Sequence, residues 1–321
     1  MGYHAMRANH SKTNAAAAPA SIMRLRCMIC FFWALDTRFF AVVPVFDRVV
    51  FPVLEAPGIC IPSLRIVPVY EVCPIFVNHS KEAIPMHSAK RIAVIGAGGK
   101  TTTLSKLADL HRTARVLLTT TTHIFPFSPP VCDRLCIAPT TEEITQALAQ
   151  PGVVCAGVPS KNGKLTGLSE EILQAASQSA DWIFYEADGA RCLPLKLHAD
   201  TEPVILPGTA HCFVVAGLSA WGKPICEVVH RYQLREDWAQ NPGRLVDGAV
   251  IADCVRDAVR ACGLPHAHLT VLLNQADTVT EKVEEIAAMV RELEAEGLTC
   301  KTCSLQEDGD LAKILSLEGI L

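Results

Sequence analysis

The chain has 321 residues, of which 50% are hydrophobic and 19% are charged, and its formal net charge is −4. This length and composition suit one large α/β domain or two small ones with a substantial apolar core. The slightly acidic balance and scattered basic residues argue against a nucleic-acid partner. The sequence contains 14 cysteines, but their spacing in so long a chain does not describe a disulfide framework.

The first 85 residues differ in composition from the rest, because a polar, alanine-rich start leads into apolar segments that repeated prolines interrupt. Arg24 and Arg26 precede an apolar run, as in a secretory signal, but no small-residue cleavage site follows promptly. No uncharged stretch reaches the roughly 18 residues that span a bilayer, so we expect no membrane partner. We predict that residues 1–85 are a poorly structured leader upstream of a native start at Met86, and that residues 86–321 form the functional domain.

From residue 86 onward, apolar strands alternate with helical segments, which predicts an α/β fold with a mostly parallel sheet and helices on both faces. A loop is expected over residues 157–167, and Ser169 is a plausible cap for the helix that follows it. The predicted strands cover residues 91–95, 116–119, 153–156, 182–185, 212–216, 270–273 and 301–305. The predicted helices cover residues 101–110, 141–150, 169–179, 247–262 and 280–296.

The most informative segment, residues 92–102, is a buried strand that runs into a glycine-rich turn and the start of a helix. Glycines let backbone N–H groups approach phosphate oxygens, and the helix N-terminus adds its positive dipole end. Lys100 supplies a mobile cation, and the Thr101 hydroxyl is a ligand for Mg²⁺. The predicted phosphate-binding residues are Gly96, Ala97, Gly98, Gly99, Lys100, Thr101 and Thr102.

Two other interpretations of this segment stay open. The standard phosphate loop is G-x-x-x-x-G-K-[ST], and Val94 replaces its first glycine, so the turn could simply need glycine to reach positive φ. The glycines also suggest a dinucleotide-binding fingerprint, but G-x-G-x-x-G requires glycine where Thr101 stands. A Rossmann-type oxidoreductase is therefore the weaker interpretation.

In parallel α/β sheets the chemistry gathers at the carboxyl ends of the strands. Residues 119–122 are four threonines in this position, suited to Mg²⁺ or phosphate, although threonine also simply favours strands. Glu186 and Asp188 follow another apolar strand. We predict that Asp188 holds Mg²⁺ together with Thr101, and that Glu186 places the attacking water. A plain turn is the alternative, because Asp-Gly is a common turn dipeptide.

Asn274 and Asp277 follow a later apolar strand in the pattern Asn-Gln-x-Asp. This pattern resembles the Asn-Lys-x-Asp element with which GTPases read guanine, so both residues are predicted to bind the nucleotide. Gln275 replaces the lysine, which leaves ATP and GTP both open. Asn and Asp at a strand end also serve as helix caps.

Two C-x-x-C pairs, Cys27/Cys30 and Cys300/Cys303, could together supply four thiolates to zinc. They stand at opposite ends of the chain, and the first pair lies in an apolar run unlike a zinc-knuckle loop. We therefore interpret the cysteines as small buried apolar residues.

The glycine loop, the threonine run with His123, and the segment 186–196 together resemble the YqeC family of selenium-dependent hydroxylase accessory proteins. Further points of resemblance are Glu202-Pro203, Gly217, Gly222, His230-Arg231 and Asn274-x-Ala-Asp277. The resemblance extends from about Lys90 to the C-terminus. It implies a cytoplasmic bacterial P-loop protein that assists molybdenum hydroxylases with a labile selenium cofactor, so it names a pathway rather than a reaction.

From the residues we expect a protein that binds ATP or GTP with Mg²⁺ and hydrolyses it through Lys100, Glu186 and Asp188. Two alternatives remain. The shortened loop is similar to the Gly-Thr-Asn-Gly-Lys-Thr-Thr of Mur ligases, which make an acyl phosphate, so a ligase or kinase is one. A non-catalytic protein that nucleotide switches between conformations is the other.

Overall fold

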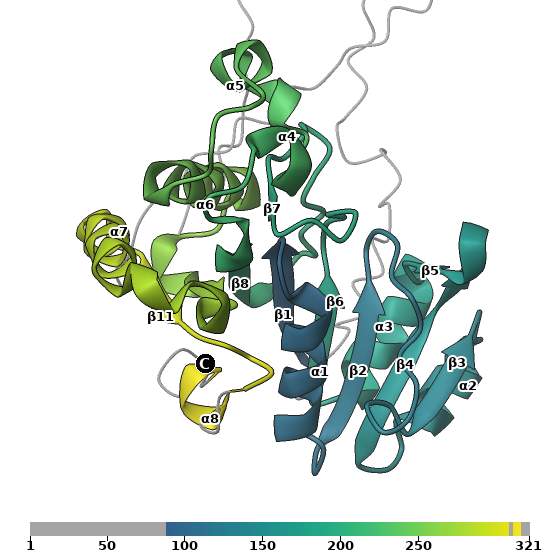
Figure 1. Ribbon diagram of the computed structural model, residues 1–321. Helices are drawn as coiled ribbons and strands as arrows, with labels where there is room; N and C mark the ends of the chain where they lie inside the picture. The colour runs from purple at the N-terminus through teal and green to yellow at the C-terminus, as the bar shows by residue number, and fades with distance from the viewer. Residues whose placement is uncertain (1–87, 308–310, 316–321) are drawn as a thin grey trace, which may run out of the picture. The chain divides into compact units, whose positions relative to one another are not determined.

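The computed structural model describes residues 88–307 and 311–315, so the predicted leader lies outside the described residues. The described residues form a nine-stranded sheet in the order β11-β10-β8-β1-β6-β2-β4-β3, with β5 paired to β4 (Figure 1). The β4–β5 pair is antiparallel, and the other pairs of this sheet are parallel. This arrangement confirms the predicted α/β fold with a mostly parallel sheet.

The strands of this sheet are β1 (Lys90–Gly96), β2 (Arg115–Thr120), β3 (Arg134–Ile137), β4 (Gly152–Pro159), β5 (Leu165–Thr166), β6 (Trp182–Glu186), β8 (Thr209–Gly217), β10 (Leu269–Asn274) and β11 (Thr299–Thr302). A separate short ribbon pairs β7 (Leu195–Lys196) with β9 (Val229–His230). The helices are α1 (Lys100–Leu110), α2 (Thr141–Ala147), α3 (Glu170–Ser179), α4 (Ile225–Val228), α5 (Glu236–Gln240), α6 (Gly248–Cys262), α7 (Val283–Ala295) and α8 (Leu311–Ile314).

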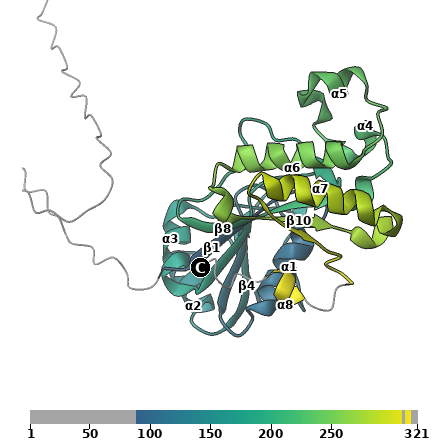
Figure 2. The same cartoon turned by 90° about the vertical axis from the view of Figure 1, so that its left-hand side faces the viewer.

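The two faces of the sheet are covered by different helices. α1 and α8 lie on one face, and α2, α3, α6 and α7 lie on the other (Figure 2). Successive residues of β1 point to opposite faces, so Ile92 and Val94 pack in the α1 layer while Ala93 and Ile95 pack in the α6 layer. Burial of both faces explains why the strands read as nearly continuous apolar runs.

The connection from β1 through α1 to β2 crosses the sheet in the opposite direction to the connections that contain α2, α3, α6 and α7. Right-handed crossovers that run in opposite directions place their helices on opposite faces, as observed for α1. The carboxyl end of β1 is therefore a topological switch point, where α/β sheets open a crevice for ligands. The glycine loop lies at this end.

Most predicted elements lie within a few residues of the observed ones. The caps also agree, since Ser169 accepts a hydrogen bond from the Ile172 N–H and Asp247 accepts one from the Val250 N–H. The expected loop over 157–167 was partly wrong, because β4 continues to Pro159 and pairs with β5. β3 was not predicted, because its half-exposed side chains break the apolar pattern. No helix within the described ranges is long and apolar enough to cross a membrane.

Candidate functional site

The glycine loop packs directly against the ends of two neighbouring strands. Gly98 and Gly99 have φ values of 80° and 144°, which side chains rarely adopt. A Cβ on Gly98 would lie 2.5 Å from the Gly217 Cα, and one on Gly99 would lie 2.3 Å from the Asn274 Nδ2. Conformation and backbone contacts thus require glycine at position 98, and conformation favours it at position 99, where the clash is with the end of a side chain. Ala97 is buried and donates its N–H to the Val215 carbonyl, so it anchors the loop.

α1 begins immediately after this loop. Its N-cap residue, Gly99, has no side chain with which to cap the helix, and the first turn contains no acidic residue. The first N–H groups of a helix have no intrahelical acceptor, and together with the helix dipole they favour an anion. Lys100 and Thr101 line a pocket at this terminus, and Thr102 lines a second, smaller one.

Asp188 is fully buried and is hydrogen-bonded to the glycine loop. Its Oδ2 accepts a 2.9 Å hydrogen bond from the Gly96 N–H and lies 3.1 Å from the Lys196 Nζ and 2.7 Å from the His198 Nε2. Its Oδ1 lies 3.0 Å from the Lys100 Nζ. Burial alone would raise the pKa of Asp188, but Lys100, His198 and Lys196 hold it well below its usual range. Asp188 is therefore ionised, with both oxygens engaged by protein groups.

Lys100 folds back onto the loop that precedes it. Its Nζ donates a 2.7 Å hydrogen bond to the Gly96 carbonyl and lies 3.7 Å from the Glu186 Oε1, in addition to its contact with Asp188. Burial alone would lower the pKa of Lys100, but the charges of Asp188 and Glu186 outweigh that effect and raise it. The ammonium therefore stays charged at the floor of the pocket.

Glu186, at the end of β6, differs from Asp188 in its environment. It lines the pocket, and its burial raises its pKa to about 7 although the charge of Lys100 acts in the opposite direction. A carboxylate with a pKa near neutrality can accept a proton in the working pH range. The two neighbouring carboxylates are thus separated by environment into an ionised holder of the loop and a candidate base.

Lys196 links Asp188 to a second carboxylate, Glu202. The Lys196 Nζ donates a 2.8 Å hydrogen bond to the Glu202 Oε2, which also accepts one of 2.6 Å from the Arg231 guanidinium. The sequence motifs assigned Glu202 no chemical role, although Glu202 is among the points of family resemblance. Lys196 is 2% exposed, so it supports the site from within rather than meeting a ligand.

His198 likewise links Asp188 to Asp257. The Asp257 Oδ2 lies 2.9 Å from the His198 Nδ1 and accepts a 2.8 Å hydrogen bond from the His198 backbone N–H. Burial alone would lower the pKa of His198, but its hydrogen bonds with Asp188 and Asp257 raise it. Neither residue was predicted from the sequence, because the two stand far apart in the chain and neither belongs to a recognisable local motif.

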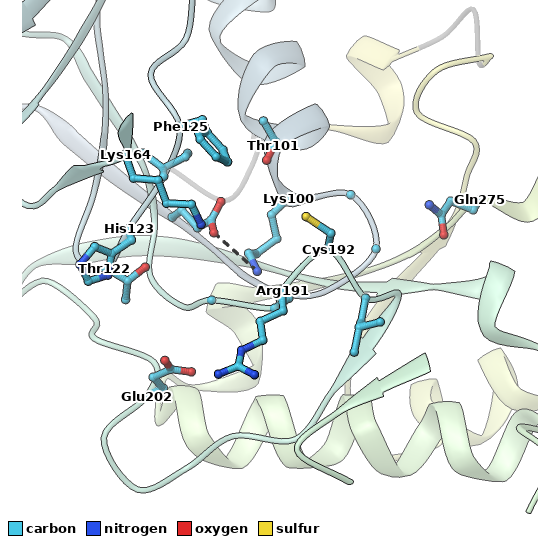
Figure 3. Close-up of a pocket in the computed structure, with 17 residues that line it drawn as sticks. Lys100, Thr101, Thr122, His123, Phe125, Lys164, Arg191, Cys192, Glu202 and Gln275 are labelled. Atoms are coloured by element: carbon cyan, nitrogen blue, oxygen red, sulfur yellow. Dashed lines mark ion pairs between the residues drawn. The ribbon is translucent and has the colours of Figure 1, made fainter. Parts of the chain in front are cut away.

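A pocket of about 360 Å³ opens over the loop and is called here the main pocket (Figure 3). This volume falls in the range of small-molecule sites. Its floor is formed by the glycine loop, Lys100 and Glu186. The side chains around its rim come from distant parts of the chain, and they include Thr122, His123, Phe125, Lys164, Arg191 and Cys192.

The predicted threonine run contributes mainly structure. The hydroxyls of Thr119, Thr120 and Thr121 donate to the carbonyl oxygens of Ala156, Glu186 and Val204, respectively, at 2.9 Å each. Thr122 is the member of the run that lines the main pocket.

A second pocket of about 180 Å³, called here the side pocket, lies between the loop and the end of β10. Asn274 braces this region, because its Nδ2 donates to the Gly98 carbonyl at 2.9 Å and its Oδ1 accepts from the Leu305 N–H at 3.0 Å. Asp277 is exposed and lines the side pocket. Both predicted base-contacting residues line the side pocket, and Asp277 is the more exposed of the two.

The predicted Mg²⁺ ligands lie in unlike positions. Thr101 lines the main pocket, whereas Asp188 is enclosed and Glu186 is the carboxylate that reaches the pocket. Within the described ranges, no cluster of three or more His, Cys, Asp or Glu side chains is arranged for a metal. Of the two C-x-x-C pairs, Cys300 and Cys303 are buried, and Cys27 and Cys30 lie outside the described residues.

Comparison with known proteins places these residues in context. Residues 92–233 match the family model described as "YqeC protein". "Uncharacterized protein YqeC" of Escherichia coli (strain K12) is 38% identical over 170 residues, which cover 49% of this chain and 64% of that protein. The chain therefore spans somewhat less than two thirds of this relative's length. The family match includes the glycine loop, Glu186 and Asp188, whereas Asn274 and Asp277 lie beyond it.

Proposed function

This chain belongs to the YqeC family, and from that premise we propose that it binds a nucleoside triphosphate, ATP or GTP, with Mg²⁺ at the glycine loop and cleaves its terminal phosphoanhydride bond. One observation carries the proposal. The N-terminus of α1 has no side-chain cap from its N-cap residue and follows two glycines with positive φ, at the floor of a ligand-sized pocket. An anion is what satisfies such a terminus.

The side chains present suit this ligand. The Lys100 ammonium would turn from the carboxylates toward the phosphates, while Asp188 keeps the loop in place through the Gly96 N–H. The Thr101 hydroxyl, in the main pocket, would hold Mg²⁺, which when bound neutralises phosphate charge. Glu186 would take the proton of the attacking water, since its pKa of about 7 lets it act near neutral pH.

Nucleotide binding to the full chain tests the proposal, with ATP and GTP compared by calorimetry in the presence of Mg²⁺. The variant Lys100→Ala should weaken binding by about tenfold or more, because a charged hydrogen bond to phosphate is lost. Lys106→Ala, in the same helix, is the matched control and should bind as wild type does. The proposal fails if neither nucleotide binds, and the loop assignment fails if Lys100→Ala binds like Lys106→Ala.

Turnover separates the candidate reactions. Steady phosphate release without an added substrate supports a nucleotide hydrolase, whereas release only with an acceptor supports the kinase or ligase alternative. Tight binding without turnover supports a conformational switch. The specific feature that favours an acceptor is the size of the main pocket, which extends well beyond the loop.

The biological setting proposed here is the maturation of selenium-dependent molybdenum hydroxylases, and it is supported by the family resemblance. Deletion of the gene from a cell that makes such a hydroxylase should lower the activity of that enzyme without lowering its amount. Complementation by wild type but not by Lys100→Ala would link this role to the glycine loop. Full hydroxylase activity in the deletion strain would contradict it.

A further inference from the structure

We infer that the main pocket holds a second substrate, a small anionic molecule with a nucleophilic hydroxyl group, which receives the terminal phosphoryl group of the nucleotide. This inference rests on the proposed function, because the nucleotide must occupy the glycine loop. In this inference the phosphoryl group passes to the hydroxyl of this second substrate instead of to water.

The two pockets lie along one edge of the sheet. Gly99 and Gln275 line both pockets, which therefore meet at the loop. Four strand spacings separate the end of β10 from the end of β2, so the two pockets extend over roughly 19 Å at about 4.8 Å a strand. In Figure 3, Gln275 lies on one side of Lys100 while His123 and Lys164 lie on the other.

This arrangement leaves space beside the nucleotide. Phosphates at the N-terminus of α1 and a base beside Asp277 would occupy the loop and the side pocket. The part of the main pocket lined by His123, Phe125 and Lys164 then remains on the far side of the terminal phosphate. We call this part the acceptor end.

The main pocket contains cationic side chains without an ion-pair partner among the described residues. Lys164 and Arg191 line the main pocket, and neither makes an ion pair with another described residue. The Lys164 ammonium instead lies 5.0 Å from the centre of the Phe125 ring. In contrast, Lys100 forms ion pairs with two carboxylates, and Glu202 forms ion pairs with two cations. Lys164 and Arg191 are therefore cations that an anionic group in the main pocket would satisfy.

Glu186 lines the main pocket together with the glycine loop, and its Oε1 lies 3.7 Å from the Lys100 Nζ. The acceptor hydroxyl would give its proton to the Glu186 carboxylate, and its oxygen would form a bond to the terminal phosphorus. The bond between that phosphorus and the bridging oxygen would break, and the electron pair would leave with the nucleoside diphosphate. Lys164 and Arg191 would hold the anionic group of the acceptor, which places its hydroxyl in line for attack.

Cys192 provides a direct readout of this pocket, because its thiol is exposed and lines it. Cys226 is also exposed but does not line the pocket, so it is an internal control. The full chain is treated with iodoacetamide, and the alkylation rate of each cysteine is followed by peptide mass spectrometry. The protein is saturated with Mg²⁺ and the imido analogue of ATP or GTP, and glycerol 3-phosphate is then added as the anionic probe, with glycerol as its neutral match.

The expected result is that the nucleotide analogue leaves Cys192 reactive and that glycerol 3-phosphate then slows its alkylation, while glycerol does not and Cys226 is unaffected. Lys164→Ala and Arg191→Ala should each raise the probe concentration needed for protection by about tenfold, since each removes one charged contact. Lys161→Ala, an exposed lysine in the same turn that does not line the pocket, is the matched control.

Two outcomes would overturn the inference. The first is that the nucleotide analogue alone protects Cys192 and excludes the probe, because the triphosphate would then fill the acceptor end. The second is that glycerol 3-phosphate gives no protection when the analogue is bound. Absence of nucleotide binding in calorimetry would instead refute the proposed function, so the two failures are distinguishable.

Discussion

Glu186 and Asp188 stand two residues apart at the end of one strand, yet their surroundings give them opposite protonation behaviour. Asp188 meets two lysines, a histidine and a backbone N–H, which together stabilise its charge. Glu186 has one cation at 3.7 Å and little solvent, so burial dominates its pKa. Residue type alone could not distinguish these roles, because the distinction depends on Lys196 and His198, which the fold places beside Asp188.

Replacing Asp188 by Asn should destabilise the protein strongly. Three buried cationic or protonatable groups would lose their counter-charge, and the loss of one partner of a buried ion pair typically costs about 3–5 kcal/mol. The free energy of unfolding from urea titration measures the effect. Asp200→Asn, at an exposed site with no ion pair among the described residues, should stay within about 0.5 kcal/mol of wild type. Equal unfolding midpoints for the two variants would contradict the assignment of Asp188 as the charge centre.

The pKa of Glu186 predicts a pH dependence of stability. Its folded-state pKa of about 7 is above the ordinary value of 4.5, so the stability associated with its protonated form is present below pH 4.5 and is lost as pH rises through about 7. The variant Glu186→Gln should therefore gain stability relative to wild type between about pH 5 and about pH 8. Urea unfolding of both proteins across this range tests the sign. A difference that is flat, or that shrinks as pH rises, would show that Glu186 does not titrate there.

At the scale of elements, two constraints fix the loop before α1: positive φ angles and close backbone contact with β8. Comparing alanine substitutions at Gly98 and Gly163 separates them. Gly98 combines positive φ with a backbone contact, whereas Gly163 has φ of 70° and no atom within 4 Å of the point that a Cβ would occupy. Gly163→Ala thus probes conformation alone. Gly98→Ala probes conformation together with displacement of β8.

We expect Gly163→Ala to cost about 1 kcal/mol of folding free energy, and Gly98→Ala to cost about 3 kcal/mol or more because Gly217 must also move. Thermal and urea unfolding measure both values. Gly98→Ala should in addition abolish nucleotide binding under conditions where the variant remains folded. Similar costs for the two substitutions would mean that the loop is not tightly packed against Gly217.

Sequence reasoning located candidate residues correctly where they directly follow a strand. The glycine loop, Glu186, Asp188 and Asp277 all stand at strand ends, so periodicity was sufficient to locate them. It failed for Lys164 and Phe125, which reach the main pocket from the turn before β5 and from the loop after β2. Their placement depends on the antiparallel return of β5 along β4, which no local pattern indicates.

At the scale of the whole molecule, the direction in which strands are added to the sheet changes at β1, which places the main pocket and the side pocket at one carboxyl edge. One half of the sheet, β6, β2 and β4, leads to segments that line the main pocket, and the other half, β8 and β10, leads to the side pocket. A nucleotide bound as proposed would contact segments that are far apart in sequence. Its binding should reduce the local motion of both halves of the sheet at the carboxyl edge.

Hydrogen–deuterium exchange with and without nucleotide tests this expectation. Local exchange should slow in residues 96–102, 119–123 and 274–278, because all three segments lie at the carboxyl edge. Residues 111–114 and 148–151 precede β2 and β4 at the opposite edge, and they should change much less. Protection confined to one half of the carboxyl edge would place the ligand elsewhere than across the loop.

The several partners of Asp188 have a consequence for how Lys100 can move. In an isolated buried ion pair, departure of the lysine strands a bare carboxylate, which makes the lysine immobile. Here Lys196 and His198 lie 3.1 Å and 2.7 Å from the Oδ2 of Asp188, whereas Lys100 lies 3.0 Å from its Oδ1. If Lys100 turned toward a phosphate, Asp188 would keep two partners at Oδ2 but lose the contact at Oδ1, so the move would carry a cost that a new anion beside Lys100 must offset.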